Sequence, residues 1–104
     1  MLFVETSRFT SEMPRYLSDD EYREFQYYLS AYPDAGDLIR GSGGIRKVRW
    51  AAKGKGKSGG VRVIYYWAKL PEQIYLLTIF GKSARADIDR RTLGQIARKL
   101  ELLK

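Results

Sequence analysis

The chain has 104 residues, a net charge of +7, and neither cysteine nor histidine. This length suits one hydrophobic core, so we expect a single domain over residues 1–104. The missing residue types exclude disulfide frameworks, cysteine nucleophiles, the usual zinc sites and histidine acid–base chemistry, and we expect no cofactor.

No apolar run is long enough for a signal peptide or a membrane span, which favours a cytoplasmic protein without membrane contact.

The segment LFVE at 2–5 predicts a short strand. Residues 6–16 are weakly patterned, and Pro14 limits or kinks any helix there. A capping box, with Ser18 at the N-cap and Glu21 three residues later, predicts the start of a helix. That helix should end at Tyr32, and its apolar stripe is formed by Tyr22, Phe25, Leu29 and Tyr32.

Three further segments, rich in β-branched and aromatic residues, predict strands at 45–52, 61–69 and 73–81. Their connections are too short for helical crossovers, so we expect an antiparallel meander. A final helix should begin near Asp89 and present one apolar face, formed by Leu93, Ile96, Leu100 and Leu103.

Charge is distributed unevenly along the chain. Residues 1–43 hold four basic and eight acidic groups, whereas residues 44–71 hold eight basic groups and no acidic one. Clustered cations favour a polyanion partner, because phosphate neutralisation releases counterions.

Side-chain alternation predicts where the cations of the strands point. Lys47 and Arg49 share one face of their strand, and Arg62 and Lys82 are expected to reach the same face, the one that the N-terminal helix leaves uncovered. Four like charges on one face repel one another, so this cluster predicts an anion site.

Other basic residues allow two interpretations. Lys53, Lys55 and Lys57 lie in a Gly-rich loop and either solubilise an edge or grip phosphate. Arg46 lies within a strand, as do Arg49 and Arg62, where a guanidinium suits phosphate oxygens. Among the aromatics we expect most to be core, and the best candidates for stacking on RNA bases are Tyr66 and Phe80.

The segments GSGGIRKVRWAAKGKGKSGGVRVIYYW and IYLLTIFGKSARAD together resemble the RelE/HigB toxins of bacterial type II toxin–antitoxin systems, closest to the HigB-like branch. The resemblance covers almost the whole chain. It implies a RelE-like α+β domain, with N-terminal helices packed on a mostly antiparallel four-stranded sheet and a C-terminal helix.

The resemblance also implies an activity: ribosome-dependent mRNA endonuclease, or mRNA interferase, inhibiting translation. The 2′-hydroxyl of the RNA attacks the adjacent phosphate without a metal, and the protein supplies proton transfer and charge stabilisation. The implied catalytic residues are Lys47, Arg49, Arg62 and Lys82, with one lysine as acid or base. Ser83 stands where well-studied members carry arginine, so Arg85 or the lysine-rich loop is the candidate replacement.

The implied partners are the ribosome, mRNA and a cognate helix-turn-helix antitoxin, and any DNA binding is expected only through the antitoxin complex. A non-catalytic RNA- or ribosome-binding module is the alternative, because the same charges and aromatics suffice for binding without proton transfer.

Overall fold

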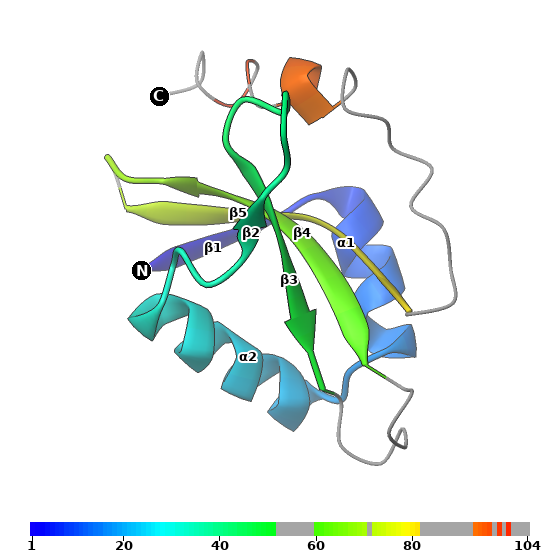
Figure 1. Ribbon diagram of the computed structural model, residues 1–104. Coiled ribbons are helices and arrows are strands. Elements are labelled where there is room, and N and C mark those ends of the chain that lie inside the picture. Colours follow the sequence, from blue (N-terminus) through cyan, green and yellow to red (C-terminus); the bar gives the residue numbers. More distant parts are fainter. Residues whose placement is uncertain (52–59, 71, 82–92, 97, 99, 101–104) are drawn as a thin grey trace.

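The computed structural model describes residues 1–51, 60–70, 72–81, 93–96, 98 and 100. In this part of the chain the fold is a small α+β structure (Figure 1). Its elements are β1 (Leu2–Glu5), α1 (Ser7–Glu12), the 3-10 helix η1 (Met13–Arg15), α2 (Asp19–Ala31), β2 (Asp37–Leu38), β3 (Ile45–Trp50), β4 (Val61–Ala68) and β5 (Gln73–Gly81).

The five strands form one mixed sheet in the order β1-β5-β4-β3-β2. The predicted meander of β3, β4 and β5 is confirmed, since both pairings are antiparallel. The expected number of four strands is wrong, because β2 adds to β3 as a fifth strand. A two-residue strand is too short to show an alternating pattern. β1 pairs with β5 in parallel.

The N-terminal helical region begins at Thr6. The Thr6 hydroxyl accepts a hydrogen bond from Phe9 N at 3.0 Å and donates one to Leu77 O at 2.8 Å, so it caps α1 and ties it to β5. Pro14 lies in η1, where the regular helix has already ended, as the sequence predicts.

The predicted capping box of α2 is present in full. Glu21 N donates to Ser18 Oγ at 3.2 Å, and Ser18 N donates to Glu21 Oε1 at 2.8 Å. The helix ends at Ala31, with Tyr32 as its C-cap, one residue before the predicted end. Tyr32 is 58% exposed, so its predicted place in the core is wrong: once the helix ends, the residue leaves the apolar stripe.

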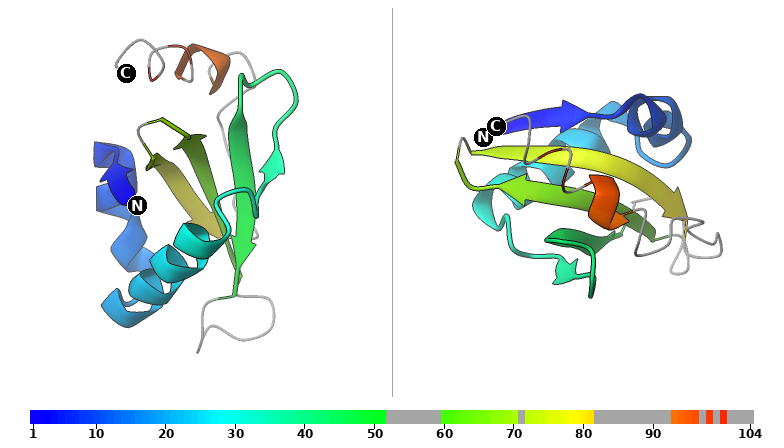
Figure 2. Two further views of the ribbon diagram at one scale, coloured as in Figure 1. Left: turned by 90° about the vertical axis from the view of Figure 1, so that its left-hand side faces the viewer. Right: turned by 90° about the horizontal axis from the view of Figure 1, so that it is seen from above.

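The helices and the sheet enclose the main core, and Figure 2 shows α1 and α2 on the same side of the sheet. Phe9, Phe25 and Leu29 from the helices are fully buried. They pack against strand residues Val48, Val61, Val63, Tyr65, Ile74, Leu76 and Ile79.

A smaller apolar cluster lies on the opposite face of the sheet. There Leu93, which is buried, packs with Ile45, Ile64 and Leu77. Residues 93–96, 98 and 100 are helical, in line with the predicted final helix, whereas Asp89 and Leu103 lie outside the described residues. The C-terminal residues thus cover part of the face that α1 and α2 leave open.

Candidate functional site

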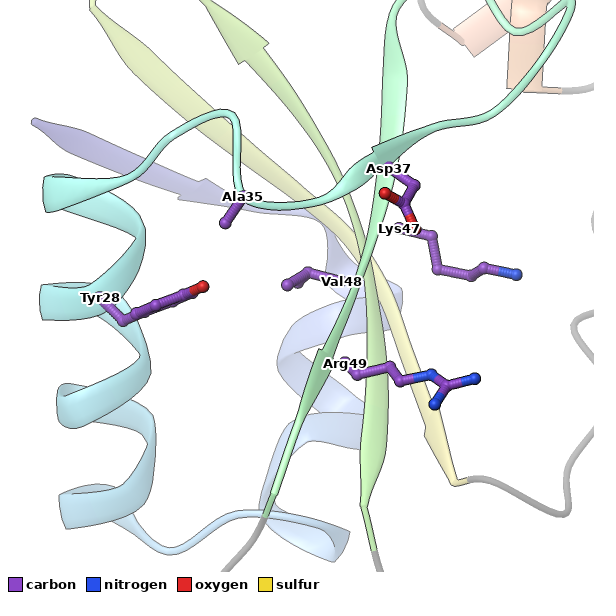
Figure 3. A pocket seen from close by; sticks show the side chains of 6 residues that line it. All are labelled: Tyr28, Ala35, Asp37, Lys47, Val48 and Arg49. Carbon is purple, nitrogen blue, oxygen red and sulfur yellow. The ribbon is translucent and has the colours of Figure 1, made fainter.

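The pairing of β3 with β4 places Arg49 directly opposite Arg62. Residues opposite each other in an antiparallel pair share a face, with their Cβ atoms about 4.5–5.5 Å apart. Lys47 lies two residues before Arg49 and therefore points to the same face. Figure 3 shows Lys47 and Arg49 extending to one side of β3 and Val48 to the other. Three of the four predicted catalytic side chains are thus brought together.

The face that carries these cations is the one away from α1 and α2. Val48 and Val63 are opposite each other and are buried in the core cluster that contains Phe25 of α2. Their sequence neighbours Arg49 and Arg62 alternate to the other face. Lys47 and Arg49 are exposed and Arg62 is half-buried, so solvent and ligands reach this cation cluster, defined as Lys47, Arg49 and Arg62.

Within the described part of the chain, no carboxylate forms an ion pair with the cation cluster. Asp37 lies opposite Lys47 in the register of β2 and β3, yet their side chains form no ion pair. Like charges placed directly opposite one another destabilise a sheet pair, and an anion bound between them removes this cost. Ion pairs of the described residues include Glu12–Arg15 and Asp20–Arg23, both away from the cation cluster.

Phe80 extends the cation cluster across the sheet. It lies opposite Arg62 in the pairing of β4 with β5, so the row Arg49, Arg62, Phe80 crosses three strands on one face. Phe80 is half-buried, which leaves part of its ring for a ligand. This arrangement sets an aromatic ring beside Arg62, with Arg49 one strand further along the row, a combination that suits a nucleotide base next to its phosphate.

Tyr66, the other predicted stacking residue, is only 5% exposed and packs in the smaller apolar cluster. Its ring centroid lies 6.4 Å from that of Tyr75. Alternation along β4 correctly predicts its face, but that end of the face is covered. Its ring is therefore not available to stack on a base, and the prediction of Tyr66 as an RNA contact is not supported by its burial.

Arg46 lies on the helix side of the sheet, where its side chain forms hydrogen bonds to the backbone. Its Nη1 donates to Gly36 O at 2.8 Å and to Asp34 O at 3.2 Å. Tyr65, fully buried, joins the same turn by donating to Pro33 O at 2.8 Å and accepting from Gly36 N at 2.9 Å. The sequence predicts Arg46 as an RNA contact, whereas the structure separates it from the cation cluster.

A pocket of about 440 Å³ opens at the edge of β3, where β2 begins (Figure 3). Its lining residues come from α2, from the connection to β2, and from β2 and β3. Lys47 and Arg49 from the cation cluster border it, so it adjoins the candidate site. The lining residues are Tyr28, Ala35, Asp37, Lys47, Val48 and Arg49.

Tyr28 is a pocket residue that the sequence does not single out. It lies beside the apolar stripe of α2, and its ring centroid is 5.2 Å from that of Trp50 and 5.5 Å from that of Tyr32. The available signal is its spacing of four residues from Tyr32, which places both on one side of the helix.

The remaining predicted site residues lie outside the described residues. This applies to Lys82 among the catalytic residues and to Lys53, Lys55, Lys57 and Arg85 among the RNA contacts. Of the side chains that are described, no three carboxylates gather into a group that could hold a metal ion.

No helix in the described part of the chain is both long enough and apolar enough to cross a membrane. No protein-family model matches this chain.

Proposed function

We propose that this protein is the toxin of a type II toxin–antitoxin pair, a RelE-like mRNA interferase that cleaves translated messages on the ribosome in the cytoplasm. The observation that carries the proposal is the pairing of Arg49 with Arg62 on the face that α1 and α2 leave open, with Lys47 beside them and no carboxylate of the described chain in an ion pair with them. The resemblance of the two basic segments to RelE/HigB toxins supports it.

In this proposal the cation cluster holds the scissile phosphate. The 2′-hydroxyl oxygen attacks phosphorus, its proton passes to a base, and the bond from phosphorus to the 5′-oxygen breaks as an acid protonates that oxygen. The products are a cyclic phosphate and a free 5′-hydroxyl. Arg49 and Arg62 stabilise the negative charge that develops on the phosphorus oxygens, and Lys47 is the described candidate for proton transfer.

Phe80 supports the proposal by giving an unpaired base a surface next to the phosphate. The ribosome and mRNA are then the partners of this face. A helix-turn-helix antitoxin would hold the protein inactive and would carry any DNA binding of the complex.

The test is Arg62→Ala. Removing one group that stabilises transition-state charge costs about 10²–10³ in rate, so growth arrest on induction and cleavage on translating ribosomes should both be lost. Arg8→Ala is the matched control, because Arg8 is an exposed arginine of α1 on the other side of the sheet. Both variants should unfold at the wild-type temperature, and full toxicity in Arg62→Ala would refute the proposed site.

A binding module without catalysis is the second candidate, favoured by the absence of histidine from the chain. Mapping of mRNA 5′ ends after brief expression separates the two functions. Cuts at fixed codon positions in translated messages indicate the endonuclease, and blocked translation with intact messages indicates the binding module.

A further inference from the structure

The pocket at the edge of β3 lies between the two faces of the sheet. We call it the β3-edge pocket; it has a volume of about 440 Å³ and is lined by the six residues labelled in Figure 3. Tyr28, Ala35 and Val48 lie on the helix side of β3, and Lys47 and Arg49 extend to the other side. A ligand in this pocket therefore meets an aromatic and apolar wall on one side and two members of the cation cluster on the other.

Between these two sides the pocket reaches an unpaired part of the edge of β3. On the side away from β4, strand β2 pairs only with Arg46 and Lys47. Ile45 O accepts a hydrogen bond from Ile39 N at 2.8 Å, so the backbone of Ile45 faces the side of β2. Backbone groups alternate in direction along a strand, and Arg49 faces the same side. Among the described residues no backbone group pairs with Arg49 there, which leaves its N–H and C=O for a ligand.

The pocket exists because the chain that precedes β2 departs from the sheet. If β2 extended toward its start, the pairing of Asp37 with Lys47 would place Ala35 opposite Arg49. Instead, Ala35 N donates to Tyr32 O at 3.0 Å in the turn that follows α2. The space that a paired strand would fill beside Arg49 is therefore open to a ligand with its own donors and acceptors.

The two sides of the pocket match the parts of a nucleotide. The Tyr28 ring is 37% exposed, and the Trp50 ring holds it at a centroid distance of 5.2 Å, so little order has to be gained when a base packs against it. Lys47 and Arg49 attract a phosphate, and a guanidinium also packs on the face of a base. An unpaired base with its phosphate therefore uses both sides of the β3-edge pocket.

Asp37 determines which bases fit. Its side chain shares a face with Lys47, which lies opposite it, and the two form no ion pair. A carboxylate only accepts hydrogen bonds, and a nearby phosphate repels it unless the ligand also donates to it. Adenine, cytosine and guanine carry an exocyclic amino group that donates, whereas uracil carries none. The carboxylate thus favours the three amino-bearing bases.

We infer that the β3-edge pocket binds an unpaired RNA base that carries an exocyclic amino group. The base lies against Tyr28, its amino group donates to Asp37, and its edge pairs with the N–H and C=O of Arg49. The adjoining phosphate lies at the cation cluster. The inference deepens the proposed function and rests on it for RNA as the ligand, and it makes Asp37 a specificity-determining residue.

The experiment uses two fluorescein-labelled oligoribonucleotides of about six residues, a length that suits a single binding site. Both consist of uridines around one central purine. That purine is adenine in one and unsubstituted purine in the other, so the two differ only by the amino group. Fluorescence anisotropy at low salt should show the wild-type protein binding the adenine oligonucleotide at least about fivefold more tightly, because one hydrogen bond to a carboxylate is gained.

Variants locate the binding. Asp37→Ala should remove the preference and bind the unsubstituted oligonucleotide at least as tightly as the wild type does, because a negative charge is lost. Tyr28→Ala should weaken both oligonucleotides about fivefold and keep the preference. Tyr27→Ala is the matched control, since Tyr27 is a 70% exposed neighbour on α2 that does not line the pocket, and it should bind as the wild type does. Circular dichroism checks that each variant is folded.

Three results would overturn the inference. The first is equal binding of the two oligonucleotides by the wild type, and the second is a preference that persists in folded Asp37→Ala. The third is a set of RNA-induced amide shifts that includes Lys47 and Arg49 but neither Tyr28 nor Ala35. Neither ribosomes nor cleavage enter this test. A base preference without cleavage on ribosomes would support the inference and refute only the proposed activity, whereas cleavage without the preference would refute the inference alone.

Discussion

The two faces of the sheet differ in how evenly they are covered. On the helix side, apolar residues of β3, β4 and β5 form one continuous cluster with α1 and α2. On the other face the same strands change character along their length. Where Ile45 is paired with Tyr66 the face is apolar and packs with Leu93, and where Arg49 is paired with Arg62 it is cationic.

This difference separates stability from the proposed function within single strands. Alternate residues of β3 and β4 face the main core and stabilise the fold. The residues between them face the other side of the sheet, where burial restricts the residue type only at the end that C-terminal residues cover. The cationic end has no such constraint from burial, because Lys47 and Arg49 are exposed. Charge can therefore accumulate there without disturbing the core.

The largest expected effect contrasts the two apolar clusters with one kind of substitution. Leu29→Ala should lower the free energy of unfolding by about 4 kcal/mol, whereas Leu77→Ala should lower it by about 2 kcal/mol. Leu29 is fully buried between α2 and the sheet in the main core, whereas Leu77 belongs to the smaller cluster, which has fewer buried side chains around the substituted residue. Urea unfolding with unchanged m values measures both. Equal losses would mean that the two faces contribute alike.

The sequence predicts much of this division, because it depends on local patterns. The capping box of Ser18 and Glu21 fixes the start of α2, and alternation places Lys47 and Arg49 on one face. Alternation does not give the register between strands, so the pairing of Arg49 with Arg62 could not be predicted. β2 is not predictable from the sequence, because a strand of two residues shows no alternation of polar and apolar side chains.

Two further site predictions, those of Arg46 and Tyr66, depend on contacts between distant segments. Arg46 looks like Arg49 in the sequence, and only the turn at residues 33–36 gives its guanidinium two carbonyl acceptors. Tyr66 lies on the predicted face, but its exposure depends on which residues cover that end of the sheet. Such cover is set by tertiary packing, which the pattern of a single strand does not contain.

A matched pair of arginines on β3 sharpens the comparison of the two faces. Arg46→Ala should lower the free energy of unfolding by about 2 kcal/mol, because charged hydrogen bonds to two carbonyls are lost, and should leave RNA affinity unchanged. Arg49→Ala should change the free energy of unfolding by no more than about 0.5 kcal/mol. It should reduce the affinity for single-stranded RNA, and the decrease of affinity with salt concentration should become less steep by the amount that one phosphate contact contributes. Reversed effects would show that the helix-side arginine is the one that contacts RNA.

The smallest expected effect concerns Tyr65 on the helix side. Tyr65→Phe keeps the buried ring but leaves Gly36 N and Pro33 O without their partner, at a cost of about 1–2 kcal/mol near pH 8. Burial raises the pKa of the Tyr65 hydroxyl, since the charged form is poorly solvated. The unfolded tyrosine ionises near pH 10, so this stabilisation is complete below that pH and is lost as the pH rises toward the folded-state pKa.

The difference in free energy of unfolding between wild type and Tyr65→Phe should therefore shrink between pH 9 and about pH 11. Urea unfolding of the two proteins side by side measures it, and taking the difference cancels the titration of the lysines and other tyrosines that both share. Tyr22, whose pKa is also raised by burial and by its hydrogen bond to Glu5, is common to both proteins and cancels likewise. A constant difference across this range would show that the Tyr65 hydroxyl does not hold the turn whose carbonyl oxygens accept hydrogen bonds from Arg46.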